Sequence, residues 1–261
     1  LNGADPITAS PTGKPWTTHT FQKQVYDPDR DIFMMYDDAG LYSYKVSTKA
    51  WTRLVGGTLP GADVSNKSLA YDPDVDPDGD GNGSVLLFLG SSVRKVYSFN
   101  YTTGAWVQEV NYPSDYPGNW SEIYTAYDSV RKLHLVYFPS AGYWFYNARA
   151  KTWSTKLTVP SEVARNGASL AYDPQSQQFL IAVPNTTIGK FELWTLDSAG
   201  VWANVGPAGG IKPPFYKFEL SYAQLWYDLI YQQFYFVLTR GGGAGGTGGI
   251  GSGDVETWAF K

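Results

Sequence analysis

The sequence predicts an all-β protein built from five similar four-stranded antiparallel units, and two repeated motifs carry this prediction. The pair Tyr-Asp occurs five times in the 261 residues, each time followed by a turn and an apolar run. Downstream comes an alternating aromatic segment, a polar turn and, in four of the five copies, a Trp. The composition agrees, because 43 aromatic residues favour strands, while 28 Gly and 16 Pro favour turns.

Each unit reads as four strands. The first ends at Tyr-Asp, and an Asp with a Pro after it favours a type I turn. The second is continuously apolar, as expected for a strand buried on both faces. The third alternates, and the fourth begins at the Trp. Both repeated residues are interpreted as structural, the Asp as a turn former and the Trp as packing between units. The copies are Tyr26-Asp27, Tyr71-Asp72, Tyr127-Asp128, Tyr172-Asp173 and Tyr227-Asp228, with Trp16, Trp51, Trp106, Trp153 and Trp202.

The fifth unit is incomplete at its own end of the chain. Its third strand reads VETWAF (255–260), and the sequence stops before a fourth strand. The missing strand is predicted at the other end, where residues 14–20 resemble the fourth strands of the other units. A strand from 14–20 would close the ring and protect its edges. The prediction is one five-bladed β-propeller over residues 14–261, with a linker at 1–13. An open β-sandwich is the alternative.

The unit resembles the kelch-type blade of galactose-oxidase-like propellers, with an apolar strand, a Tyr-rich strand, a polar turn and a Trp. The resemblance covers nearly the whole chain. It departs at the double glycine after the second strand, for which Gly90-Ser91 and Gly241-Gly242 are the nearest matches. The resemblance therefore implies the fold. It does not imply the oxidase chemistry, which needs a Tyr-Cys crosslink, because the chain has no Cys.

The clearest local motif lies between the first two strands of the second unit. Alternating carboxylates with glycines can wrap oxygen ligands around a hard cation, and the motif resembles short DxDxDG calcium loops. It lacks the Glu that closes an EF-hand loop, since Leu87 stands there. We predict a structural calcium site, with a solvated acidic loop as the alternative. The predicted ligands are Asp74, Asp76, Asp78, Asp80 and Asn82.

Aromatic residues outside the repeats are the candidate ligand-binding residues. They lie in two connectors, 111–120 and 213–218, each joining one unit to the next. Exposed aromatic rings beside amides and carboxylates suit sugar rings or a protein surface. Packing of each loop on itself is the alternative. The residues are Tyr112, Tyr116, Trp120, Phe215 and Tyr216.

Other features exclude several functions. A net charge of −4 argues against nucleic-acid binding through a basic surface, and no apolar stretch reaches the roughly 18 residues of a membrane span. His134 falls in an apolar strand and is interpreted as a core residue. The glycine-rich stretch 241–253 is not a phosphate loop, because no GK[ST] follows it. No Ser/His/Asp set can be assembled.

These observations predict a non-catalytic binding or assembly module. Its partner would be a glycan or protein surface, with self-assembly or a larger particle as further options. Five N-x-[ST] sequons, at Asn66, Asn82, Asn100, Asn119 and Asn185, favour an extracellular or virion-surface location. An adhesin, a lectin and a phage tail or capsid-associated protein all fit. A five-bladed glycoside hydrolase is the alternative, because such an enzyme needs only two or three carboxylates.

Overall fold

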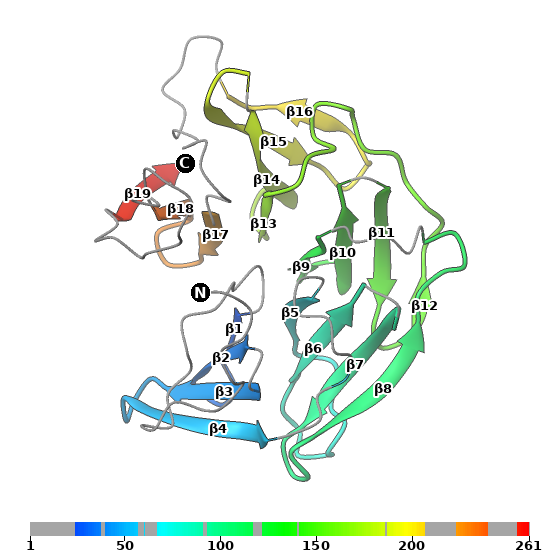
Figure 1. Ribbon diagram of the computed structural model, residues 1–261, viewed down its shortest axis with the longest axis vertical. Coiled ribbons are helices and arrows are strands. Elements are labelled where there is room, and N and C mark those ends of the chain that lie inside the picture. Colours follow the sequence, from blue (N-terminus) through cyan, green and yellow to red (C-terminus); the bar gives the residue numbers. More distant parts are fainter. Residues whose placement is uncertain are drawn as a thin grey trace, which may run out of the picture. The chain divides into compact units, whose positions relative to one another are not determined.

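The computed structural model describes residues 24–37, 40–56, 60, 67–90, 93–116, 122–139, 141–185, 187–206, 223–239 and 255–260. Every named element in this part of the chain is a β-strand, and none of it forms a helix long and apolar enough to span a membrane. The strands make five antiparallel sheets. Within each sheet the strands follow one another in chain order (Figure 1).

Four of the sheets have four strands each. The first contains β1 (Gln24–Asp27), β2 (Ile32–Asp37), β3 (Gly40–Lys45) and β4 (Ala50–Gly56). The second contains β5 (Lys67–Asp72), β6 (Ser84–Leu89), β7 (Lys95–Asn100) and β8 (Ala105–Asn111). The third contains β9 (Tyr124–Asp128), β10 (Leu133–Phe138), β11 (Gly142–Asn147) and β12 (Thr152–Trp153). The fourth contains β13 (Ser169–Asp173), β14 (Gln178–Asn185), β15 (Lys190–Leu196) and β16 (Trp202–Asn204).

The fifth sheet has three strands, β17 (Ala223–Asp228), β18 (Gln233–Thr239) and β19 (Val255–Phe260). The predicted four-stranded antiparallel blade is thus confirmed four times. The strand predicted from residues 14–20 lies outside the described residues. A closed ring of five complete blades is therefore not shown.

The sheets divide into two compact units. The first unit holds the first three sheets, and the second holds the last two together with the turn Asp128–Arg131. The second strands β6, β10 and β14 are largely buried, whereas in the first sheet β3 is more buried than β2. All six residues of β6 are buried, and β10 and β14 are exposed only in part at their ends. The prediction that these apolar strands are covered on both faces is confirmed.

The Asp of each Tyr-Asp pair caps the turn that follows it. Oδ1 of Asp27, Asp128 and Asp228 accepts the backbone N–H groups two and three residues later, over 2.8–3.2 Å. The turn then ends in a left-handed residue, for example Lys132 with φ 60°. These carboxylates stabilise the turns by accepting backbone hydrogen bonds. Their interpretation as structural residues is confirmed.

The Tyr of the pair joins adjacent sheets. The Tyr71 hydroxyl donates to Asp29 in the turn of the first sheet, and the Tyr127 hydroxyl donates to Asp74 in the loop of the second. In the second unit, burial and then a hydrogen bond to Asp173 raise the pKa of Tyr227 to about 12. The repeated pair therefore serves both the turn and the contact between sheets.

Candidate functional site

The acidic motif occupies an enlarged turn. Asp72 pairs with Ser84 across β5 and β6, so residues 73–83 take the place of the four-residue turn that connects β1 and β2. Asp72 still caps the chain, accepting the Asp74 N–H over 2.8 Å. Gly79 and Gly81 have φ of 72° and 83°, a conformation that glycine adopts without strain. The loop can therefore bend tightly around its own carboxylates.

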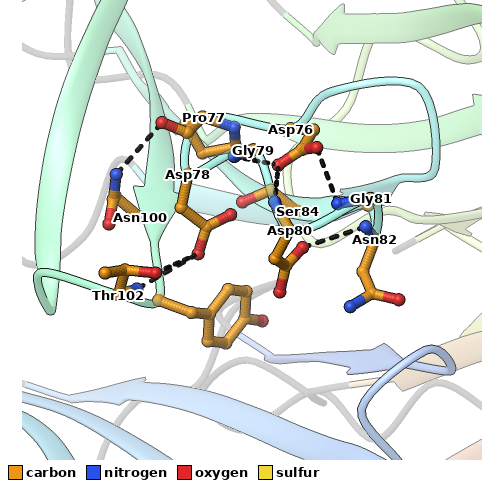
Figure 2. A network of polar contacts seen from close by, with 12 residues as sticks. Asp76, Pro77, Asp78, Gly79, Asp80, Gly81, Asn82, Ser84, Asn100 and Thr102 are labelled. Atoms are coloured by element: carbon orange, nitrogen blue, oxygen red, sulfur yellow. Dashed lines mark hydrogen bonds between the residues drawn. The ribbon is translucent and has the colours of Figure 1, made fainter.

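Three carboxylates converge in this loop. Asp76, Asp78 and Asp80 each offer an oxygen, and these atoms all lie within 4.8 Å of one another (Figure 2). Asp76 accepts the N–H groups of Gly79 over 2.7 Å and Gly81 over 2.9 Å. Backbone donors thus fix the orientation of the first carboxylate of the group.

Backbone hydrogen bonds favour the ionised forms of Asp76 and Asp80. The hydrogen bond from the Gly81 N–H is the largest of the effects that hold the pKa of Asp76 below its usual value. For Asp80, the N–H of Asn82 is the largest cause of a lowered pKa. Adjacent anionic carboxylates repel one another unless a cation lies between or beside them.

Asp78 carries an oxygen without a hydrogen bond. Its Oδ2 accepts the backbone N–H of Thr102 over 3.1 Å, but Oδ1 is buried and receives no hydrogen bond from the described residues. The side chain as a whole is 1% exposed. A buried carboxylate oxygen without a partner is costly. The atom is thus a candidate ligand for a cation.

Arg30 is a cationic residue that lies next to the three carboxylates. Its Nη2 lies 2.6 Å from Oδ2 of Asp80 and 4.0 Å from Oδ1 of Asp78. The residue comes from the turn between β1 and β2, some fifty positions earlier in the chain. Sequence reasoning missed it, because nothing in the local pattern of either segment indicates that the two turns meet.

The two remaining predicted ligands make different contacts, Asp74 with the third sheet and Asn82 with Asp80. Oδ2 of Asp74 accepts the Tyr127 hydroxyl over 3.0 Å and lies 3.3 Å from Nζ of Lys132, so it is used in a contact with the third sheet. Asn82 donates its backbone N–H to Oδ1 of Asp80 over 2.9 Å. Asp76, Asp78 and Asp80 therefore form the centre of the candidate cation site, and Asn82 lies beside Asp80.

The predicted aromatic site has a different outcome. The expectation that Tyr112 and Tyr116 are exposed is wrong, because they are only 8% and 3% exposed. The Tyr116 ring lies 4.5 Å from that of Phe138, and its hydroxyl donates to the carbonyl of Gly90. The two rings fill the space between the second and third sheets, where burial of apolar area outweighs solvation of the hydroxyls. Trp120, Phe215, Tyr216 and the stretch 241–253 lie outside the described residues.

His134 is a core residue, as predicted. It is fully buried, and its Nε2 lies 2.8 Å from Oδ2 of Asp72. This contact joins β10 of the third sheet to the end of β5. Both groups are withdrawn from solvent, so they act in packing.

An exposed aromatic face occurs on the fifth sheet, where none was predicted. Trp226 on β17 is 43% exposed and stacks on Tyr235 of β18, with ring centroids 5.7 Å apart and planes 20° apart. The Nε2 group of Gln233 donates to the Tyr235 hydroxyl. The adjoining turn, Leu229, Ile230 and Tyr231, is 66–84% exposed. This face combines flat rings, an amide and apolar side chains.

A signal for this face exists in the sequence. LWYDLIYQQFYFVL (225–238) aligns without a gap with LAYDPQSQQFLIAV (170–183). Trp226 and Tyr235 replace Ala171 and Leu180, which are buried in the core between the fourth and fifth sheets. An apolar Leu-Ile-Tyr turn replaces Pro-Gln-Ser. Both segments have the apolar and aromatic composition of a β-strand, so the repeat pattern does not show that one pair of side chains is buried and the other exposed.

Together, the four-stranded antiparallel sheets define an all-β protein with blades of the β-propeller type, carrying an acidic loop and an exposed aromatic face. The sequence matches no protein-family model, and no curated protein shows significant similarity to it.

Solved structures are similar in fold. A protein of unknown function from Bacteroides thetaiotaomicron aligns over 87% of this chain and 55% of its own, with a TM-score of 0.55 and 12% identity. An auxiliary nutrient binding protein from the same organism aligns over 82% of this chain and 55% of its own, with a TM-score of 0.51 and 10% identity. A GH74 xyloglucanase from Xanthomonas campestris aligns over 83% of this chain and 36% of its own, with a TM-score of 0.51 and 13% identity.

At these identities the likeness concerns the fold alone. The chain spans about half the length of the first two structures and about a third of the xyloglucanase.

Proposed function

We propose that the protein is a non-catalytic binding module that works in an extracellular setting, on a cell or virion surface. The observation that carries the proposal is the exposed stack of Trp226 on Tyr235. Flat aromatic rings flanked by an amide suit the apolar faces of sugar rings, or a protein surface with apolar side chains. The sequons support an exported protein, and the nutrient-binding neighbour agrees with a binding activity on this fold.

The repeated carboxylates favour binding over catalysis. Asp27, Asp128 and Asp228 cap turns, and Asp74 accepts a hydroxyl from the neighbouring sheet. A glycoside hydrolase needs a pair of carboxyl groups that are free to act on the glycosidic bond. The glycosidase alternative would have to use acids other than these.

A glycan array combined with product analysis tests the proposal. The full chain should retain one class of glycan without releasing sugar. Trp226→Ala should abolish retention, whereas Ile188→Ser, which alters an apolar residue of the same unit that is 50% exposed, should not. Release of sugar that a single carboxylate substitution abolishes would establish the hydrolase instead. Self-assembly without affinity for glycans or proteins would indicate an architectural subunit.

We also propose that Asp76, Asp78 and Asp80 hold a calcium ion that stiffens the loop. The buried Oδ1 of Asp78, without a hydrogen bond among the described residues, supports this assignment. The donor set fits because calcium takes six to eight oxygen ligands from carboxylates, carbonyls and water. When bound, the ion would supply charge neutralisation and rigidity to this loop.

Completion of the fifth sheet by residues 14–20 remains part of the proposal, and this closure adds an edge strand that leaves the face with Trp226 and Tyr235 uncovered. β19 is the last strand of a three-stranded sheet, whereas the other four sheets each have a fourth strand. A strand from 14–20 would complete this sheet and cover its edge. Deleting residues 1–20 should then unfold or aggregate the protein, whereas a truncated chain of unchanged stability would contradict the closure.

A further inference from the structure

The guanidinium of Arg30 occupies a fixed place beside the acidic loop. Nη1 donates to the Gly83 carbonyl over 2.6 Å and to Oδ2 of Asp27 over 3.2 Å. The guanidinium carbon lies 3.8 Å from the ring centroid of Tyr101. Arg30 is therefore held by the first sheet, by the aromatic ring and by the end of the loop, independently of its contact with Asp80.

The same guanidinium leaves Asp78 unsatisfied. Nη2 lies 2.6 Å from Oδ2 of Asp80, but it is 4.0 Å from the buried Oδ1 of Asp78, which is beyond hydrogen-bonding distance. Oδ1 of Asp78 points into the group formed with Asp76 and Asp80. One cation is thus in contact with Asp80, while the buried Oδ1 of Asp78 has no cation within hydrogen-bonding distance among the described residues.

We propose that Arg30 is a built-in competitor at this site, so that its positive charge sets how tightly the loop binds a divalent cation. The inference depends on the calcium site proposed above. An ion held by Asp78 and Asp80 must share Asp80 with Arg30 or displace it. Arg30 can yield Asp80 because Asp27 and the Gly83 carbonyl remain as its partners.

Coulomb's law gives the expected size. A divalent ion and a guanidinium about 5 Å apart in a water-like dielectric repel each other enough to weaken binding roughly tenfold. Removing the charge of Arg30 should therefore strengthen cation binding. Removing a positive charge that belongs to a different contact should have little effect.

Calorimetric titration of the full chain with calcium chloride tests this inference. Arg30→Gln should bind calcium at least about fivefold more tightly than the wild type, and Arg30→Lys, which keeps the charge, should stay within about twofold. Lys132→Gln is the matched control, because Lys132 pairs with Asp74 outside the group. Arg30→Met, which retains the packing of the aliphatic stem on Tyr101, replaces Arg30→Gln if that variant does not fold.

The outcomes separate the inference from the site on which it depends. Calcium binding by Arg30→Gln but not by the wild type would support the inference strongly. Equal or weaker binding by Arg30→Gln would overturn it and leave the calcium site standing. Terbium can be added in place of calcium, with Tyr101 as the sensitising residue. If no variant binds calcium and terbium gives no sensitised luminescence, both the calcium site and the competing role of Arg30 are wrong. None of these three results affects the proposal for the fifth sheet.

Discussion

The hydroxyl of Tyr127 donates to Oδ2 of Asp74 over 3.0 Å, which ties the first strand of the third sheet to the enlarged loop of the second. Tyr71 makes the equivalent contact with Asp29 one sheet earlier. Tyr26 differs, because its hydroxyl donates to Asp31 in its own turn over 3.0 Å. The Tyr71 and Tyr127 hydroxyls thus act between adjacent sheets, whereas the Tyr26 hydroxyl acts within its own turn.

Tyr127→Phe should lower the free energy of unfolding by about 0.5–1.5 kcal/mol, because it removes one partly exposed hydrogen bond to a carboxylate. Urea denaturation monitored by circular dichroism measures the change. Tyr26→Phe is the control, since its hydroxyl bond stays within one turn. Equal effects of the two substitutions would show that the contact between sheets adds nothing.

The capping aspartates should make stability sensitive to acid. Burial opposes ionisation of Asp128, but the N–H of Arg131 and further hydrogen bonds outweigh it, so the pKa of Asp128 lies below its usual value. A carboxyl group with a lowered folded pKa stabilises the protein above its unfolded pKa of about 3.9, and this stability is lost as the pH falls through the folded value. Unfolding free energy should therefore decline below about pH 5.

Asp128→Asn tests the contribution of this residue. The substitution should cost about 1–3 kcal/mol at pH 7, since it removes charge-assisted bonds to Arg131. It should also flatten the decline between about pH 5 and pH 2. An unaltered pH profile would mean that other carboxyl groups account for the acid sensitivity.

The contact between His134 and Asp72 should be essential for stability. His134→Ala leaves the buried carboxylate of Asp72 without its 2.8 Å partner and opens a space beside Phe88. We expect a loss of about 3–5 kcal/mol in unfolding free energy. His134→Gln, which keeps a donor, should lose less. A small effect of the alanine variant in chemical denaturation would show that solvent replaces the imidazole.

Calcium should raise the melting temperature, and a chelator should lower it again. Asp78→Asn should remove this response, because Asp78 supplies the buried oxygen of the group. Asp74→Asn should keep it, because Asp74 is engaged with Tyr127 and Lys132. Melting curves with calcium and with chelator distinguish the two. If both variants lose the calcium-dependent rise in melting temperature, Asp74 is a ligand as well. If calcium does not change the melting temperature of the wild type, the loop holds no calcium site.

Local rules predicted the parts of the fold that depend on neighbouring residues. The caps at Asp27 and Asp128 and the burial of β6 follow from turn chemistry and from an apolar run of strand length. Each is decided within about ten residues of sequence. Such features can be read from one unit and repeated along the chain.

The sequence could not predict features that depend on contacts between sheets. The connector that contains Tyr112 and Tyr116 has the composition of an exposed aromatic loop, but both rings pack on Phe138 of the third sheet and are buried. Arg30 reaches Asp80 across fifty residues of sequence. Which side chains remain exposed, and which charge accompanies an acidic loop, depend on surfaces that meet only after folding.

The most direct test of the binding proposal is to measure both melting temperature and ligand retention for Trp226→Ala. If the stack on Tyr235 is a binding surface, the melting temperature should remain within about 2 °C of the wild type, as for other surface substitutions, while retention on the glycan array is lost. Ala171 and Leu180, at the equivalent positions of the fourth sheet, pack inside the protein. A fall of many degrees would place Trp226 in packing as well and contradict the account.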